Sequence, residues 1–240
     1  MKQLLTLAFV GALQLGAMAQ KHVYEDLLVM YVDEKYEKCI AKAESYINAD
    51  DTKRDALPFL YVSMCYYEMS RNTKYEVDYP KAAVEALKWA VKYRKKDKEK
   101  EFFNNYEDYW SSLNTMALEM GEGLLDDPKT LSKAKQIWVA ATGYYPENPG
   151  AWLMLAMCQY KSNLAKEGDL SIQEYNKAVA AAGDVSTLPV DQKKMLKNGV
   201  IRYCDYLVSK GMRDQARKVA TVVKDAFMAE DDFKGMWNSL

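Results

Sequence analysis

The pattern of apolar and polar positions is clearest over residues 133–160, where small and bulky apolar residues recur at intervals of three and four. Ala134, Trp138 and Ala141 lie on one face of a helix at this spacing. Pro146 is expected to end that helix, because the residue before a proline is pushed out of the helical region. The stretch therefore predicts a helix that stops at a proline turn.

A second helix is predicted directly after this turn. Asn148 is a favourable capping residue, and Pro149 suits the first helical position, where its missing N–H costs nothing. Trp152, Leu155 and Ala156 then continue the apolar face. Small residues allow two helices to approach closely, and the tryptophans fill the space beside them.

The same pattern recurs along the chain, with one small residue in each helix that occupies the second position of a hairpin. These residues are Cys39, Ala82, Ala134, Ala178 and Ala216, which lie 43, 52, 44 and 38 residues apart. The pattern predicts about five helical hairpins, the first near 22–48 and the last near 189–229, with 234–240 as a capping segment. Inserted loops are predicted at 71–78, 94–104, 119–128 and 162–171.

Local signals predict where some of these helices begin and end. Asp127 and Pro128 are expected to start a helix. Ser171 and Glu174 have the spacing of a capping box at a helix N-terminus. Gly211 suits the left-handed residue that commonly follows a helix.

The two predicted helices of residues 133–160 and the proline turn between them resemble the tetratricopeptide repeat (TPR), a helix–turn–helix unit of about 34 residues. Ala134, Trp138, Ala141 and Pro146 match the spacing of the family's second helix, and the helix that follows matches the start of the next unit. The intervals between units exceed those of the family. The resemblance implies an all-α fold, a right-handed α-solenoid of about five antiparallel hairpins whose first helices line a concave face.

The resemblance also implies which positions face a ligand on the concave side. In the second and fourth hairpins they are Leu60, Met64, Tyr67, Glu68, Leu153, Met157, Tyr160 and Lys161. A stripe of Leu, Met and Tyr suits a peptide or a helix, because Met adapts to irregular surfaces and Tyr combines apolar area with a polar tip. The alternative is that a neighbouring helix, the C-terminal tail or a second copy covers these residues. The third hairpin has the more polar set Ser111, Thr115, Leu118 and Glu119.

The first twenty residues, MKQLLTLAFVGALQLGAMAQ, have the order of a secretory signal. Lys2 precedes an apolar run, and Ala17 and Ala19 precede the predicted cleavage site after Ala19. Residues 1–19 are therefore predicted to be a signal peptide and 20–240 a single helical repeat domain, exported to the periplasm or the cell surface. The apolar run is short for a membrane span, and no other stretch is long enough, so no transmembrane anchor is expected.

Four cysteines in an exported protein raise the question of disulfides. They are Cys39, Cys65, Cys158 and Cys204, and each lies in an apolar helical pattern rather than a loop. The pattern favours buried free thiols, and one disulfide remains an alternative. The only histidine, His22, has no ligand cluster near it, so no metal and no cofactor are predicted.

Charge and motifs narrow the function. The chain has 33 basic and 34 acidic residues, which argues against nucleic acid as the partner. It carries none of the common nucleophile, zinc-protease or phosphate-loop motifs, and no enzyme is predicted. The expected function is a protein interaction module or scaffold of the bacterial envelope that holds a peptide, a helix or an assembly subunit. The alternative is a self-associating structural subunit whose concave face is filled, and a homo-oligomer is compatible with either.

Overall fold

The described chain is built from helices. The computed structural model describes residues 22–240, so the predicted signal peptide and its cleavage site lie outside the described residues. Within this range there are eleven α-helices, three short 3-10 helices and no strand, which confirms the all-α class. The helices are α1 Glu25–Val32, α2 Tyr36–Asn48, α3 Leu57–Ser70, α4 Ala82–Lys96, α5 Glu107–Glu122, α6 Leu131–Tyr144, α7 Pro149–Lys161, α8 Ala165–Ala182, α9 Val190–Ser209, α10 Arg213–Phe227 and α11 Asp231–Ser239.

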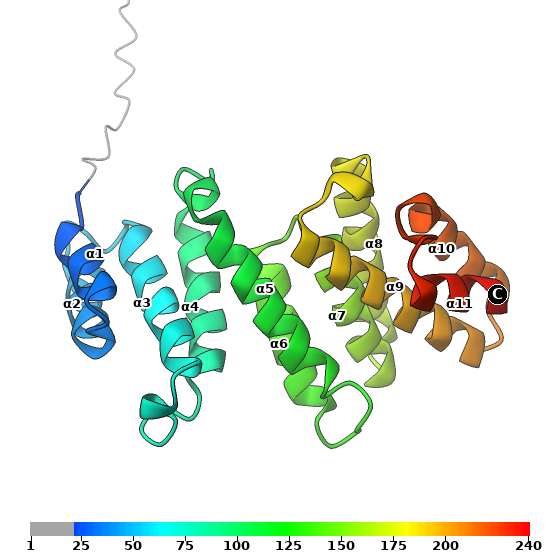
Figure 1. Cartoon of the computed structure of the whole chain (residues 1–240), viewed down its shortest axis with the longest axis horizontal. Helices are drawn as coiled ribbons and strands as arrows, with labels where there is room; N and C mark the ends of the chain where they lie inside the picture. The colour runs from blue at the N-terminus through cyan, green and yellow to red at the C-terminus, as the bar shows by residue number, and fades with distance from the viewer. Residues whose placement is uncertain (1–21) are drawn as a thin grey trace, which may run out of the picture.

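Consecutive helices form pairs that follow one another along the long axis of the molecule (Figure 1). The five pairs run from α1 with α2 to α9 with α10, and the last helix, α11, packs on α9 and α10. The predicted first and last hairpins thus agree with the structure. The predicted C-terminal capping segment is a helix that begins earlier, at Asp231, and buries Phe233 and Met236.

The turn between α6 and α7 follows the sequence signals. Helix α6 ends at Tyr144, before Pro146, and Pro149 is the first residue of α7. The side chain of Asn148 accepts a hydrogen bond from the backbone N–H of Gly150 at 3.1 Å, which satisfies an N–H that has no partner inside the helix. Trp152 adds a bond from its indole N–H to the carbonyl of Pro146 at 2.7 Å.

Two predicted helix starts are wrong. Helix α6 begins at Leu131 rather than at Asp127 and Pro128. Residues 128–130 form a turn, in which the Asp127 side chain accepts a bond from the N–H of Lys129. Ser171 lies inside α8 and donates to the side chain of Gln159 at 2.7 Å, so it does not cap a helix. The predicted left-handed residue Gly211 is confirmed, with φ of 76°.

Three clusters of buried side chains make up the core, and they divide it along the long axis. One joins α1 to α4, a central one joins α3 to α7, and the third joins α7 to α11. Helices α3 and α7 contribute to two clusters each and are buried over most of their length. A helix that is apolar all round is enclosed on all sides, and these two sequences have that composition.

The helix pairs do not stack in a uniform way. Helix α4 packs on α6, and α9 packs on α7 and also reaches α5. The backbones of α3 and α5 lie further apart, and these two helices meet through side chains, such as the Ser63 and Tyr109 hydroxyls at 2.7 Å. A buried polar link holds α9 against α5 and α6. The amide of Asn114 donates to the carboxylate of Asp191 at 2.7 Å, and its oxygen accepts from the Tyr144 hydroxyl at 2.8 Å. The third and fifth pairs are therefore joined directly, while the first helices of the second and third pairs, α3 and α5, meet through side chains without close backbone approach.

Candidate functional site

Five of the eight predicted ligand-facing residues are buried inside the chain. These residues are Leu60, Met64, Tyr67, Leu153 and Met157, each with an exposed fraction of 8% or less. The prediction that they form a free apolar stripe is wrong. The physical reason is that α3 and α7 carry apolar side chains on every face, so neighbouring helices cover the stripe.

The contacts identify the helices that cover the stripe. Leu60 and Met64 belong to the central core together with Leu113 of α5. Leu153 faces α9, where its Cβ lies only 3.1 Å from the point that a Cβ on Gly199 would occupy. The small residue on α9 thus permits a close approach that buries Leu153. The alternative stated from the sequence, cover by a neighbouring helix, describes this part of the molecule.

Tyr160 and Lys161, at the end of α7, join neighbouring elements to each other. The Tyr160 ring lies parallel to the rings of Tyr203 and Tyr206 on α9, at centroid distances of 6.1 and 5.6 Å. Its hydroxyl donates to Asp169 at 2.8 Å, and burial together with this bond raises the pKa of Tyr160. The ammonium of Lys161 contacts the carboxylate of Asp126 at 3.0 Å.

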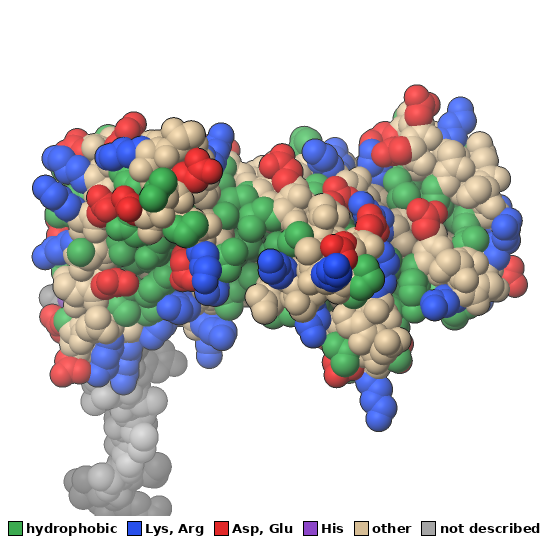
Figure 2. Space-filling model, turned by 90° about the horizontal axis from the view of Figure 1, so that it is seen from below, with side chains coloured by type: hydrophobic (Ala, Val, Ile, Leu, Met, Phe, Trp, Pro, Cys, Tyr) green, Lys and Arg blue, Asp and Glu red, His purple; other side chains and the backbone are tan. Residues whose placement is uncertain are grey.

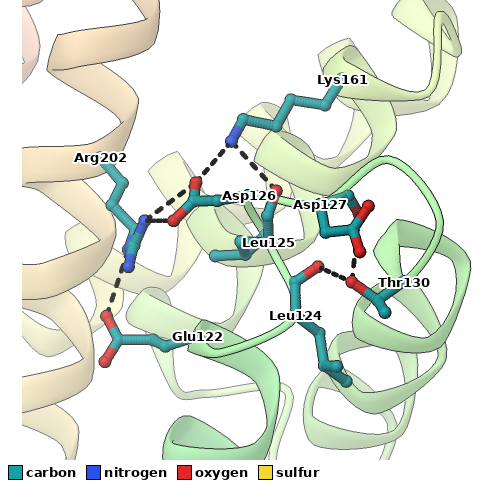
Figure 3. A network of polar contacts seen from close by, with 8 residues as sticks. All are labelled: Glu122, Leu124, Leu125, Asp126, Asp127, Thr130, Lys161 and Arg202. Carbon is teal, nitrogen blue, oxygen red and sulfur yellow. Dashed lines mark hydrogen bonds and ion pairs between the residues drawn. The ribbon is translucent and has the colours of Figure 1, made fainter.

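Lys161 belongs to a polar network in which the loop after α5 meets α7 and α9 (Figure 3). Arg202 of α9 contacts Glu122 and Asp126 at 3.3 Å each, and Lys161 also donates to the carbonyl of Leu125 at 3.1 Å. Lys161, which has the larger effect, and Arg202 together hold the pKa of Asp126 below its ordinary value. The network fixes the loop against two helices, and its groups satisfy one another.

A groove lies where α3 and α5 separate. It has a volume of about 590 Å³ and is lined by side chains from α1, α3, the 3-10 helix Phe103–Tyr106 and the first turns of α5. Two predicted residues, Tyr67 and Glu68, are in its wall. The lining residues are Tyr31, Tyr67, Glu68, Arg71, Asn104, Asn105, Tyr106, Glu107, Asp108, Tyr109 and Ser112. These come from the first helices of the first three pairs.

One wall of the groove is an ordered set of tyrosines and charges. The Tyr31 hydroxyl donates to Glu68 at 3.2 Å, and burial raises the pKa of Tyr31. Arg71 donates to the Tyr67 hydroxyl at 2.9 Å and lies over the same ring at 5.3 Å. The ring of Tyr67 in turn meets Tyr109 edge to face at 5.7 Å. This wall is preorganised, because each ring is held by a second contact.

The opposite wall carries polar side chains that have free hydrogen-bonding capacity. Asn104, Asn105, Glu107 and Asp108 are exposed, and their side chains make no hydrogen bond or ion pair with residues 22–240. Together with Glu68, the groove has three carboxylates against the one guanidinium of Arg71. The groove is therefore acidic and aromatic, and two exposed amide side chains in its wall are free to bind a partner.

A buried aspartate fixes the segment that bears this wall. Asp97 is 4% exposed, and its carboxylate accepts from the N–H groups of Glu101, Phe102 and Phe103 at 2.7, 3.1 and 3.0 Å. The ring of Phe103 stacks on Trp110 at 4.6 Å with an interplanar angle of 7°. The turn before α5 is thus tied at both ends, which holds the groove-lining residues in place.

The sequence pattern missed Tyr31, Arg71 and the segment 104–108 as site residues. A signal was present, since the inserted loop at 94–104 runs into consecutive polar residues, Asn-Asn-Tyr-Glu-Asp, at a helix start. Polar residues that follow a long insertion are typical of a functional loop. The separation of α3 from α5, which creates the groove, had no local signal.

The fold and the groove define the class of this chain, an all-helical protein of consecutive helix pairs with an acidic and aromatic groove near one end. No protein-family model, no curated protein and no solved structure matches it. Among residues 22–240, no helix has the length and apolarity that a membrane span requires. The same residues contain no group of three or more His, Cys, Asp or Glu side chains that could hold a metal ion.

Proposed function

We propose that this protein is a non-enzymatic interaction module of the bacterial cell envelope, which holds a segment of a partner protein in the groove between α1, α3 and α5. In this proposal the helix pairs form a right-handed, TPR-like α-solenoid, and the groove lies on the face of its first helices. The observation that carries the proposal is the row of unpaired amides and carboxylates opposite an ordered tyrosine wall. The proposal moves the predicted binding site from the buried stripe to this groove.

The size and the lining favour a peptide. About 590 Å³ lies in the range of ligand pockets, but those that hold small molecules are mostly apolar, and this groove is polar and open. The amide side chains of Asn104 and Asn105 each offer donors and an acceptor, which is the complement of a peptide backbone. A peptide that crosses the groove satisfies both amides without displacing protein contacts.

The charge of the groove favours a basic segment. Glu68, Glu107 and Asp108 outnumber Arg71, and the Arg71 guanidinium is already engaged with Tyr67. Tyrosine faces attract cations, a contact worth about 0.5–2 kcal/mol that depends on desolvation. A Lys or Arg of the partner therefore finds carboxylates beside the partly exposed rings of Tyr31 and Tyr106.

The test is photo-crosslinking in the cells that make the protein. A photoreactive residue at Asn105 is expected to capture one protein, identified by mass spectrometry, whereas the same residue at Val222, exposed on α10, does not capture it. Charge reversal by Glu107→Lys with Asp108→Lys is expected to abolish the crosslink. Asp214→Lys with Asp225→Lys, on the exposed surface of α10, is the matched control and leaves it intact. Equal capture at Asn105 and Val222 would refute the proposal.

The alternative function, self-association of a structural subunit, also has an observation in its favour. Leu28, Val29 and Val32 are 49%, 57% and 68% exposed on α1, at the end of the row of helices. Terminal units of helical stacks need a polar outer face for solubility, so this apolar face favours a contact with another chain. Light scattering distinguishes the two functions. If Val29→Lys with Val32→Lys converts an oligomer to a monomer, the structural role gains support.

A further inference from the structure

The outer side of α4 carries a row of lysines. Residues 88, 92 and 95 follow one another at intervals of four and three, which puts them on one face of the helix. The residues at the two ends of α4 and one residue of the adjacent helix α6 extend the row. We call these six exposed side chains the lysine face: Lys81, Lys88, Lys92, Lys95, Lys96 and Lys133. Figure 2 shows Lys and Arg side chains gathered along the lower edge of the part of the molecule that holds α1 to α4.

The positive charge of this face is largely uncompensated. Helices α4 and α6 contain a single acidic residue, Glu85, and its carboxylate is paired with the ammonium of Lys88 at 2.7 Å. Residues 98–101, after α4, add two lysines and two glutamates and so leave the excess unchanged. The whole chain has a formal net charge of −1. The lysine face is therefore a local excess of positive charge on a nearly neutral protein.

Two apolar side chains flank the lysines. Trp89 is partly exposed, and the ammonium of Lys92 lies 3.4 Å from the centroid of its ring. Val139, on the outer side of α6, is 52% exposed. Tryptophan is enriched where an apolar phase meets water, because it combines a large apolar area with a polar N–H. Lysine suits the same boundary, since its apolar stem lies along apolar surface while its ammonium stays in water.

We propose that the lysine face docks on an anionic phospholipid surface. Clusters of four to eight Lys or Arg residues on a helix are typical of attachment to acidic lipids. The six cations are all Lys, which acts as a hydrated point charge, whereas recognition of a single carboxylate or phosphate favours the fork of Arg. None of them lines the groove or the smaller pockets of the described chain. Charge that is spread over a helix without a pocket fits an extended anionic surface.

The lysine face and the groove are separate sites of opposite charge. The groove is lined by α1, α3, the 3-10 helix before α5 and α5 itself, whereas the lysine face lies on α4 and α6. Helix α5 contains four acidic residues and no basic one. An anionic surface that attracts α4 therefore repels α5, and this orients the docked molecule with its groove open. The proposal does not depend on the proposed function of the groove.

The experiment is flotation of the purified protein with lipid vesicles. One set of vesicles contains phosphatidylcholine alone, and the other contains phosphatidylcholine and phosphatidylglycerol in equal parts. The protein is expected to float with the second set only. Binding is expected to weaken as sodium chloride is added, because salt screens exposed charges. Binding that is equal for the two sets, or flotation with neither, would overturn the proposal.

Matched variants assign the binding to this face. Lys88→Gln with Lys92→Gln and Lys95→Gln is expected to lower the partition coefficient about 100-fold. Gln is a good helix former, so α4 is expected to persist, and circular dichroism checks this. The control removes three exposed lysines of α8, α9 and α10, which changes the net charge equally, and is expected to retain binding: Lys166→Gln, Lys194→Gln and Lys218→Gln. An equal loss of binding in the two triple variants would contradict the assignment.

Two further measurements identify the surface and the partner. Lipid brominated in its acyl chains is expected to quench part of the tryptophan fluorescence of the bound protein, and Trp89→Phe is expected to remove this quenching while flotation persists. Quenching that Trp89→Phe leaves unchanged would refute docking through this face. Soluble polyglutamate is expected to bind at least tenfold more weakly than the anionic vesicles. Polyglutamate that binds as tightly as the vesicles would overturn the proposal in favour of an acidic protein partner.

Discussion

The crossing of α7 and α9 allows a sharp prediction about a single methyl group. Gly150 lies in the first turn of α7, where an added Cβ would meet the backbone of α9. That Cβ would lie 2.5 Å from the carbonyl carbon of Met195 and 2.8 Å from the Cα of Leu196. Backbone atoms in a helix cannot turn aside as a side chain does. We therefore expect Gly150→Ala to force the two helices apart.

The magnitude follows from the geometry. Ordinary contacts begin near 3.4 Å, so the helices must separate by about 1 Å, and a gap of this size forfeits a quarter to a half of each dispersion contact across it. Overpacking of this kind costs about 1–3 kcal/mol, occasionally more. The higher helix propensity of Ala offsets this cost by at most about 1 kcal/mol. The expected net loss of unfolding free energy is about 1–2 kcal/mol.

Two other glycines provide matched controls. Around Gly235 in α11 there is nothing within 4 Å, so Gly235→Ala is expected to stabilise the chain by about 0.5–1 kcal/mol. At Gly143 the nearest atom belongs to the side chain of Val91, at 3.1 Å, and this side chain can shift. Urea unfolding followed by circular dichroism should rank the variants in the order Gly235→Ala, Gly143→Ala, Gly150→Ala. A Gly150→Ala chain as stable as Gly235→Ala would refute the reasoning.

Three further predictions concern polar groups. Asn114→Ala leaves the Asp191 carboxylate and the Tyr144 hydroxyl without their partner. We expect the free energy of unfolding, measured in urea, to fall by about 2–4 kcal/mol. A fall below about 1 kcal/mol would contradict this prediction. Asp97→Ala is expected to accelerate hydrogen exchange at the N–H groups of residues 101–103 while exchange in α10 is unchanged. The pKa of Asp126 in the folded chain lies below its ordinary value of 3.8. The ionised carboxylate therefore stabilises the fold above pH 3.8, and this stabilisation is lost as the pH falls through the pKa of the folded chain. Asp126→Asn is therefore expected to destabilise the chain near pH 6 by less than about 1 kcal/mol, because the side chain is 70% exposed, and this difference should vanish toward pH 2.

The sequence was most informative where structure depends on neighbouring residues. Pro146, Asn148 and Pro149 indicated the end of one helix and the start of the next, because capping and proline geometry act within a few residues. The helix pairs and the first and last hairpins followed from the apolar periodicity. Ser171 misled because its capping-box spacing also occurs inside a long helix, where the hydroxyl finds a partner on α7.

The candidate site depended on features that no local pattern encodes. Leu60 and Leu153 occupy positions that face a ligand in the resembling family, but here neighbouring helices cover them. The all-round apolar composition of α3 and α7 was a signal of this burial. The groove arises because the close backbone approach to the third pair is made by α4 rather than α3, and this packing depends on contacts between segments far apart in the chain.

The buried hydrogen bond from Asn114 to Asp191 determines which truncations of the chain the fold can tolerate. In a strictly linear array each unit depends only on its neighbours, and removal of the last one leaves the rest intact. Here removal of α9 would strip the third pair of its partner and leave the Asn114 amide without its acceptor in the core. The third to fifth pairs are therefore expected to fold and unfold as one cooperative unit. Among the described residues, the terminal pair, α1 with α2, makes no such bond to a distant pair, so its removal would leave the rest of the fold in place and would take Tyr31 out of the groove wall.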